Sequence, residues 1–144
     1  MRGSSRLRAA PRHAVAPEVA RHEPYRKSAD VFSFAMLCFE LITHEVPFAD
    51  KLPVMASLAT SFQGLRPPLP SGIPPLISDL ITRCWHADPT ERPSFEKVHE
   101  GLGRVPYALS AEETRWLDSP NGHPVYSAAP GSELNSRLRD VSIC

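Results

Sequence analysis

The stretch from Asp30 to Thr43 restricts the fold of this chain more than any other part of the sequence. It reads DVFSFAMLCFELIT, and between its two ends only Ser33 and Glu40 are polar. Its length and its alanine, methionine and leucine content favour a helix over a buried strand, which is the competing interpretation. A run of about 14 residues is too short to cross a bilayer, which needs about 20. We therefore expect the central helix of a mainly α domain, buried on every face because it is apolar on every face.

The residues around this stretch carry helix-boundary signals. Ser28 is expected to cap the start of the helix. Asp30 lies in the first turn, where a negative charge is favourable beside the positive end of the helix dipole. His44 and Pro47 are expected to mark the C-terminal end.

Three further helices are predicted from the spacing of apolar residues. They are expected at about Leu52–Phe62, Leu76–Trp85 and Phe95–Leu102. Ser94 is placed to cap the last of these, and Gly101 and Gly103 are expected to end it. The residues expected to face the core are Val54, Leu58, Ser61 and Phe62 in the first helix, Leu76, Ile77, Leu80, Ile81 and Cys84 in the second, and Phe95, Val98 and Leu102 in the third.

A proline-rich connector, RPPLPSGIPP at residues 66–75, separates two of these helices. Its prolines predict an extended, polyproline-like segment. The first part, Arg66-Pro67-Pro68-Leu69-Pro70, is similar to the ligands of SH3 domains, whose grooves accept polyproline helices. The alternative is that this segment packs against its own domain.

The composition argues against several classes of function. The chain has 16 basic and 16 acidic residues, and a formal net charge of zero argues against a nucleic-acid binder. The three cysteines show no zinc or redox spacing, and the six histidines form no recognisable metal motif. No apolar run near the N-terminus resembles a signal peptide. We expect a cytoplasmic protein that binds neither nucleic acid nor membrane; the alternative is an organelle transit segment in the arginine-containing first 17 residues.

The chain is expected to divide into three segments. Residues 1–14 lack periodicity and are expected to be flexible, whereas residues 15–104 contain the predicted helices. Residues 105–144 mix proline, glycine, serine and asparagine and are expected to be mostly disordered. A short helix is plausible there, because Ser110-Ala111-Glu112-Glu113 is a capping-box pattern; it would run through Leu117.

Four motifs carry a resemblance to a known family. They are Ala16-Pro17-Glu18, the S-A-D-V-F-S-F-A sequence from Ser28, Pro47-Phe48, and the C-W-H-A-D-P-T-E-R-P-S-F sequence from Cys84 to Phe95. In this order and spacing they resemble the second half of the C-terminal lobe (C-lobe) of a protein kinase domain, of the tyrosine-kinase-like serine/threonine group. The resemblance runs from about residue 15 to residue 104. The residues that match the structural family motif are Ala16, Pro17, Glu18, Asp30, Trp85, Pro89, Arg92 and Pro93.

The resemblance implies a family that uses ATP and magnesium to phosphorylate serine or threonine, or tyrosine, in protein substrates. It implies an ion pair between Glu18 and Arg92, since these residues meet in related kinases. In those kinases the counterpart of Asp30 binds the backbone of a catalytic loop that this sequence lacks, so we expect Asp30 to face solvent. The elements that cover one side of the central helix in a full lobe are also absent, so we expect an exposed apolar patch.

The motifs that contact ATP and magnesium in the family are absent from this sequence. It has no G-x-G-x-x-G, no V-A-I-K and no D-F-G. His86-Ala87-Asp88 resembles the H-R-D triplet, but Pro93 stands where the metal-binding asparagine should be. We therefore assign no catalytic, cofactor-binding or metal-binding residue. The interpretation is a partial kinase domain that is inactive alone; the alternative is a non-catalytic interaction module or scaffold that uses the helices or the proline-rich loop.

Overall fold

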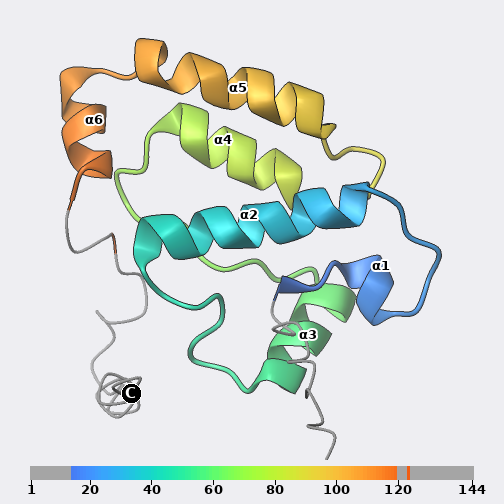
Figure 1. Cartoon of the computed structure of the whole chain (residues 1–144). Helices are drawn as coiled ribbons and strands as arrows, with labels where there is room; N and C mark the ends of the chain where they lie inside the picture. Colours follow the sequence, from blue (N-terminus) through green and yellow to red (C-terminus); the bar gives the residue numbers. More distant parts are fainter. Residues whose placement is uncertain (1–13, 120–122, 124–144) are drawn as a thin grey trace, which may run out of the picture.

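The structure is a computed structural model that describes residues 14–119 and residue 123 (Figure 1). Over these residues it has six helices and no strand, which confirms the predicted mainly α fold. The helices are α1 (Pro17–Ala20), α2 (Ser28–Thr43), α3 (Pro53–Phe62), α4 (Pro75–Cys84), α5 (Phe95–Ala108) and α6 (Ala111–Leu117). Of the expected flexible segment at residues 1–14, only Ala14 is described. In the tail from residue 105, which was expected to be mostly disordered, residues 105–119 are described and are largely helical; the predicted short helix through Leu117 is confirmed as α6, and the rest of the tail except His123 lies outside the described residues.

Helix α2 lies at the centre of the molecule, as predicted (Figure 1). Helices α4 and α5 lie together on one flank of α2, and α1 and α3 lie together on the opposite flank. Phe32, Met36 and Phe39 of α2 are fully buried and share one apolar cluster with Ile81 and Cys84 of α4. Each large apolar side chain buried in this way contributes about 1.5–3 kcal/mol, so the contact between α2 and α4 stabilises the fold substantially.

The start of α2 differs from the prediction, because Ser28 does not cap the helix. Ser28 is the first helical residue, and Lys27 occupies the N-cap position without a side-chain hydrogen bond. The N–H of Ala29 already donates to the carbonyl of Arg26 (2.9 Å), so the chain turns into the helix before Ser28. At the other end, His44 has a left-handed backbone (φ 56°) and its N–H donates to the carbonyl of Glu40, which closes the helix at the predicted place.

One stripe of α2 is exposed in the described part of the molecule. Leu37 is 49% exposed and Leu41 is 66% exposed. Asp30 is exposed too, and it lies on the same stripe because seven and eleven residues are about two and three helical turns. The expectation that α2 is buried on every face was therefore wrong, and the expected exposed apolar surface is present. The physical reason is that the described helices cover the two flanks of α2 and leave this stripe open.

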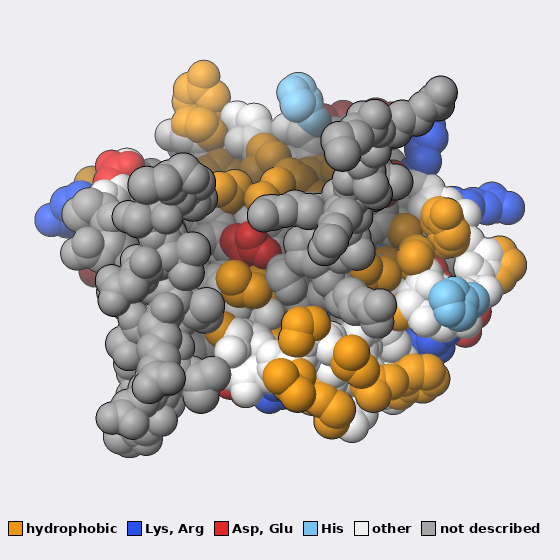
Figure 2. Space-filling model, turned by 60° about the horizontal axis from the view of Figure 1, so that its bottom comes forward, with side chains coloured by type: hydrophobic (Ala, Val, Ile, Leu, Met, Phe, Trp, Pro, Cys, Tyr) orange, Lys and Arg blue, Asp and Glu red, His pale blue; other side chains and the backbone are white. Residues whose placement is uncertain are grey.

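Helix α3 buries the face that its large apolar residues do not occupy. Val54, Leu58 and Phe62 were predicted to face inward, but they are 54%, 44% and 69% exposed. Of the predicted inner residues only Ser61 is buried, and the buried face consists of Ala56, Ala59, Thr60 and Ser61. Helix α3 packs against α1, and small side chains allow the two helices to approach closely. Figure 2 shows hydrophobic side chains gathered on this outer face of the molecule.

Helix α4 agrees with its prediction to within one residue at each end. Its buried residues are Ile77, Leu80, Ile81 and Cys84, all of which were predicted to face the core. The connector before it forms neither helix nor strand at residues 65–70, turns at Ser71 and Gly72, and gives its last proline, Pro75, to the first turn of α4. No described helix is long and apolar enough to span a membrane.

Helix α5 is longer than predicted, because its two glycines and a proline do not end it. The helix continues through Gly101, Gly103 and Pro106 to Ala108. A Cβ at Gly101 would lie 3.5 Å from the Leu80 side chain, so the glycine permits close packing of α5 on α4. Ser94 does cap the helix, since its hydroxyl accepts a hydrogen bond from the N–H of Lys97.

The predicted inner face of α5 is only partly correct. Val98 is buried, whereas Phe95 is 42% exposed and Leu102 is 38% exposed. Phe95 instead meets the ring of Phe34 on α2 edge-on, with the ring centroids 5.9 Å apart. The N-terminal end of α5 therefore reaches α2 through an aromatic pair at the surface.

Candidate functional site

The centre of the candidate site is a buried ion pair between Glu18 and Arg92, which confirms the predicted pairing. Nη1 of Arg92 lies 2.7 Å from Oε1 of Glu18, and Nη2 lies 2.9 Å from Oε2. Glu18 is 3% exposed and Arg92 is 6% exposed. Two parallel hydrogen bonds between a guanidinium and a carboxylate are the strongest form of such a pair, and burial protects this pair from screening by salt.

The Arg92 guanidinium also joins three segments of the chain. Its Nη1 donates to the Ser28 carbonyl at the start of α2 (2.9 Å), and its Nε donates to the His86 carbonyl (2.9 Å). Pro17 sets the first turn of α1 and so directs Glu18 into the core. Arg92 thus fixes α1, α2 and the loop between α4 and α5 relative to one another.

A second arginine, Arg66, contacts the same buried ring as Arg92. The guanidinium carbons of Arg66 and Arg92 lie 5.0 and 5.1 Å from the centroid of the buried Phe32 ring. Nε of Arg66 donates to the carbonyl of Trp85 (2.8 Å). Burial, together with the charge of Arg92, lowers the pKa of Arg66 to about 10, so Arg66 remains protonated at neutral pH.

Arg92 determines the direction in which the pKa of Glu18 is shifted. Burial alone would raise the pKa of this carboxyl group, but the hydrogen bonds and the positive charge of Arg92 outweigh burial and lower it. Glu18 is therefore ionised at neutral pH, with both oxygens occupied by Arg92.

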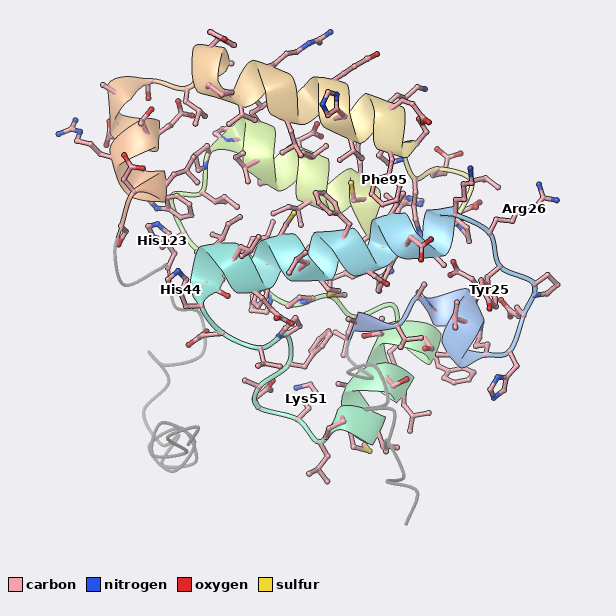
Figure 3. The ribbon with its side chains drawn as sticks, in the orientation of Figure 1. Tyr25, Arg26, His44, Lys51, Phe95 and His123 are labelled. Atoms are coloured by element: carbon pink, nitrogen blue, oxygen red, sulfur yellow. The ribbon has the colours of Figure 1, made fainter. Side chains whose placement is uncertain are left out.

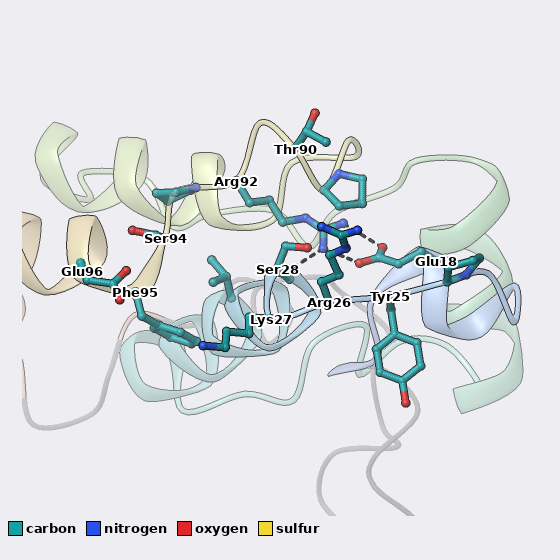
Figure 4. A pocket seen from close by; sticks show the side chains of 14 residues that line it. Glu18, Tyr25, Arg26, Lys27, Ser28, Thr90, Arg92, Ser94, Phe95 and Glu96 are labelled. Atoms are coloured by element: carbon teal, nitrogen blue, oxygen red, sulfur yellow. Dashed lines mark hydrogen bonds and ion pairs between the residues drawn. The ribbon is translucent and has the colours of Figure 1, made fainter.

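A groove of about 1030 Å³ opens beside the ion pair (Figure 4). The loop from Pro24 to Ser28 forms one wall of the groove, and the segment from Pro89 to Glu96 forms the other. Rings and aliphatic side chains alternate with charged groups along it; the lining residues are Glu18, Pro24, Tyr25, Arg26, Lys27, Ser28, Val31, Pro89, Thr90, Arg92, Pro93, Ser94, Phe95 and Glu96. Figure 4 places Tyr25 and Phe95 at opposite ends of the view, with Lys27 beside Phe95.

The residues of this groove do not form a binding site for magnesium and ATP, the cofactors of the kinase family that the sequence motifs resemble. Glu18 binds Arg92 through both carboxylate oxygens, and the other acidic residue that lines the groove, Glu96, is an exposed single carboxylate. Within residues 14–119 and at residue 123 there is no group of three or more His, Cys, Asp or Glu side chains that could hold a metal ion. No described segment forms the glycine-rich strand–turn cover that binds the phosphates in a kinase.

The structure brings most of the motif residues together around Arg92. Ala16 and Pro17 are buried beside Glu18, Trp85 is 5% exposed, and Pro89 and Pro93 line the groove. Asp30 stays apart from this cluster and is exposed, as expected from the absence of its usual partner loop. In the proline-rich connector, Pro67 and Pro70 are buried, so this segment packs against its own domain in the structure.

Two features of the site were not found from the sequence. The first is Arg66, which was noticed only as part of a possible SH3 ligand; its position before two prolines gave no indication of a buried role. The second is the groove, whose walls at Tyr25 and Phe95 lie 70 positions apart and come together only through the packing of α2 and α5. No local pattern could have indicated that meeting.

Comparisons with known proteins agree with this arrangement. The sequence model of the protein tyrosine and serine/threonine kinase family matches residues 3–102. The chain is 37% identical over 109 residues to serine/threonine-protein kinase STY17 of Arabidopsis thaliana, and this alignment covers 76% of this chain and 19% of that protein. It is 39% identical over 84 residues to serine/threonine/tyrosine-protein kinase HT1 of the same plant, covering 58% of this chain and 22% of that protein. It is 42% identical over 87 residues to scaffold protein ILK of Homo sapiens, covering 58% of this chain and 19% of that protein. The chain therefore spans about a fifth of the length of these relatives.

Proposed function

Because this chain belongs to the protein tyrosine and serine/threonine kinase family, we propose that it forms the second half of the C-lobe of a serine/threonine kinase domain. The buried pair of Glu18 and Arg92 is the observation that carries this proposal, since it joins the A-P-E and R-P motifs in space. Serine or threonine phosphorylation of proteins is then the activity of the complete domain.

The chain by itself is proposed to bind no magnesium–ATP and to transfer no phosphate. Phosphoryl transfer by a kinase requires a strand lysine at the phosphates, a catalytic Asp, and Asp and Asn ligands for magnesium. The lysines of this sequence are Lys27, Lys51 and Lys97, which lie at the start of α2, between α2 and α3, and on α5. None of these positions is on a strand, and of the two acidic residues that line the groove, Glu18 is held by Arg92.

Isothermal titration of the 144-residue chain with magnesium–ATP tests this proposal. We expect no saturable heat up to millimolar ATP. Micromolar binding would contradict the proposal. In that case the double variant Arg26→Ala and Lys27→Ala would tell whether the nucleotide occupies the groove, because these are its exposed cationic side chains.

A second candidate function, a non-catalytic interaction module, is supported by the outer face of α3. This helix contains no charged residue, and large apolar side chains on it and beside it are exposed: Leu52, Val54, Met55, Leu58, Phe62 and Leu65. Exposed apolar patches of this kind mark interaction sites in soluble proteins. The similarity to a relative that is named a scaffold protein supports the same candidate.

Quantitative pull-down with three forms of the chain tests the second candidate. The forms are the natural chain, a double variant Leu58→Gln and Phe62→Gln on α3, and the control Tyr107→Gln on α5, where the side chain is 91% exposed. If α3 binds a partner, the same protein is retained by the natural chain and the control and lost with the α3 variant. Equal retention by all three forms would exclude α3 as the contact.

A further inference from the structure

The described residues that follow the segment matched by the family model contact α2 and the turn before α4. The match stops at residue 102, whereas α6 and His123 lie beyond it. Helix α6 lies at the end of the molecule where α2 terminates (Figure 1). Figure 3 shows His123 beside this C-terminal end of α2, at the opposite end of the helix from Tyr25 and Arg26.

The first contact of this region is between Trp116 and the turn at Gly72. A Cβ built on Gly72 would lie 3.0 Å from Nε1 and 3.4 Å from Cδ1 of the Trp116 indole. The indole therefore rests directly on the backbone of the turn that precedes α4. Gly72 also has a φ of 80°, a conformation that favours glycine. Both the positive φ and the close approach of the indole disfavour a side chain at this position.

The second contact is made by His123, which covers the same indole. The two rings are stacked with their centroids 3.4 Å apart and their planes 4° from parallel. The His123 ring also contacts the carbonyl of Trp116 through Nε2. Its backbone N–H donates to the carbonyl of Ile42 (3.0 Å), in the last turn of α2. The last carbonyls of a helix lack partners within the helix, so this bond satisfies one of them.

We infer that α6 and His123 form a clasp that locks the C-terminal end of α2 to the Gly72 turn. The clasp consists of Trp116 and His123 on one side and of Gly72 and Ile42 on the other. The N-terminal end of α6 is held by a capping box, in which the side chains of Ser110 and Glu113 each accept a hydrogen bond from the other residue's backbone N–H. The described contacts with α2 and the turn thus include α6 and His123, which lie past the segment matched by the family model, and release of the clasp frees α2 and the turn together. This inference does not depend on the proposed function.

A comparison of two glycines tests the contact between Trp116 and the turn. Gly72 and Gly64 both have positive φ values, 80° and 66°, so alanine is strained at either position. Only Gly72 has a neighbour, since nothing lies within 4 Å of a Cβ at Gly64. We expect Gly72→Ala to lower the Tm of the full chain by about 4–8 °C more than Gly64→Ala. In a Trp116→Ala background the two substitutions should have equal effects. Equal shifts in the natural background would overturn the inference.

Hydrogen exchange on the His123→Ala variant provides a second test, which leaves the core unchanged. The amides to follow are His44, which donates to Glu40 at the end of α2, and Ile73, which donates to Pro70 beside the turn. We expect both to exchange at least about tenfold faster than in the natural chain, while the Ala20 amide in the distant α1 does not change. Faster exchange confined to α6 would mean that α6 is an independent appendage and would overturn the inference.

Discussion

Arg92 binds both carboxylate oxygens of Glu18 although 74 positions separate the two residues in the sequence. The bond lengths of 2.7 and 2.9 Å and the near-complete burial of both side chains make this a strong polar contact. Its importance is geometric as well as energetic. The same guanidinium holds the carbonyls of Ser28 and His86, so removal of Arg92 leaves a buried carboxylate and two carbonyls without their donor.

The first prediction concerns the loss of this pair. Arg92→Ala should lower the free energy of unfolding by about 3–5 kcal/mol, because it leaves an uncompensated buried charge. Urea denaturation measures the change. Arg83→Ala is the matched control, since Arg83 pairs with Asp79 on the exposed surface of α4, where such pairs contribute less than about 1 kcal/mol. Similar losses for the two variants would contradict the assignment of Arg92 as the central residue.

The second prediction is a pH dependence that originates at Glu18. The pKa of Glu18 is lowered in the folded state relative to its usual value of 4.5. A carboxyl group of this kind stabilises the fold above its unfolded-state pKa, and this stabilisation is lost as the pH falls through the folded-state pKa. The free energy of unfolding should therefore decrease below about pH 4.5.

The variant Glu18→Gln isolates this contribution from those of other carboxylates whose pKa values are lowered, such as Asp88, Glu96 and Glu113. The difference in unfolding free energy between the natural chain and Glu18→Gln should shrink as the pH is lowered. A difference that is constant from pH 7 to pH 3 would show that Glu18 does not contribute through its charge.

The third prediction concerns Asp30, which is exposed at the start of α2. Asp30→Asn should change the free energy of unfolding by less than about 1 kcal/mol, because only the interaction with the helix N-terminus is altered. Urea denaturation of the two forms is the measurement. A loss above about 2 kcal/mol would indicate that the carboxylate has buried partners.

The fourth prediction distinguishes the two faces of α3. Phe62→Ser removes a large apolar side chain that is 69% exposed and should change the stability by no more than about 0.5 kcal/mol. Ala59→Leu adds a bulky side chain at a position that is 5% exposed and should cost about 1–3 kcal/mol. Thermal denaturation in parallel checks both. A larger loss of stability for Phe62→Ser than for Ala59→Leu would indicate that α3 buries the face predicted from the sequence.

The fifth prediction concerns the thiols of Cys38 and Cys84. Burial raises the pKa of each to about 11, so at pH 8 only about one thiol in a thousand is the reactive thiolate. In a Cys144→Ser chain, a disulfide reagent should therefore react slowly in buffer and rapidly in urea. Rapid reaction of the folded chain would show that the cluster between α2 and α4 opens readily.

The sequence by itself determined the positions of α2, α3, α4 and α6, the start of α5, and the motif pair. The apolar run and its composition located α2, helical periodicity located α4 because its apolar residues face the core, and the capping signals at Ser94 and Ser110 act locally on the next few N–H groups. The pairing of Glu18 with Arg92 was implied by motifs, since both residue types and their order are readable in the chain.

Tertiary structure decided what local pattern could not. Which face of α3 is buried depends on the small side chains that fit against α1, and α5 continues through Gly101, which packs against Leu80. Arg66 is half-buried because it contacts the Phe32 ring and the Trp85 carbonyl, and Trp116 meets Gly72 across 44 positions of sequence. Burial is a property of two surfaces that meet, and the sequence of one surface does not specify which partner reaches it.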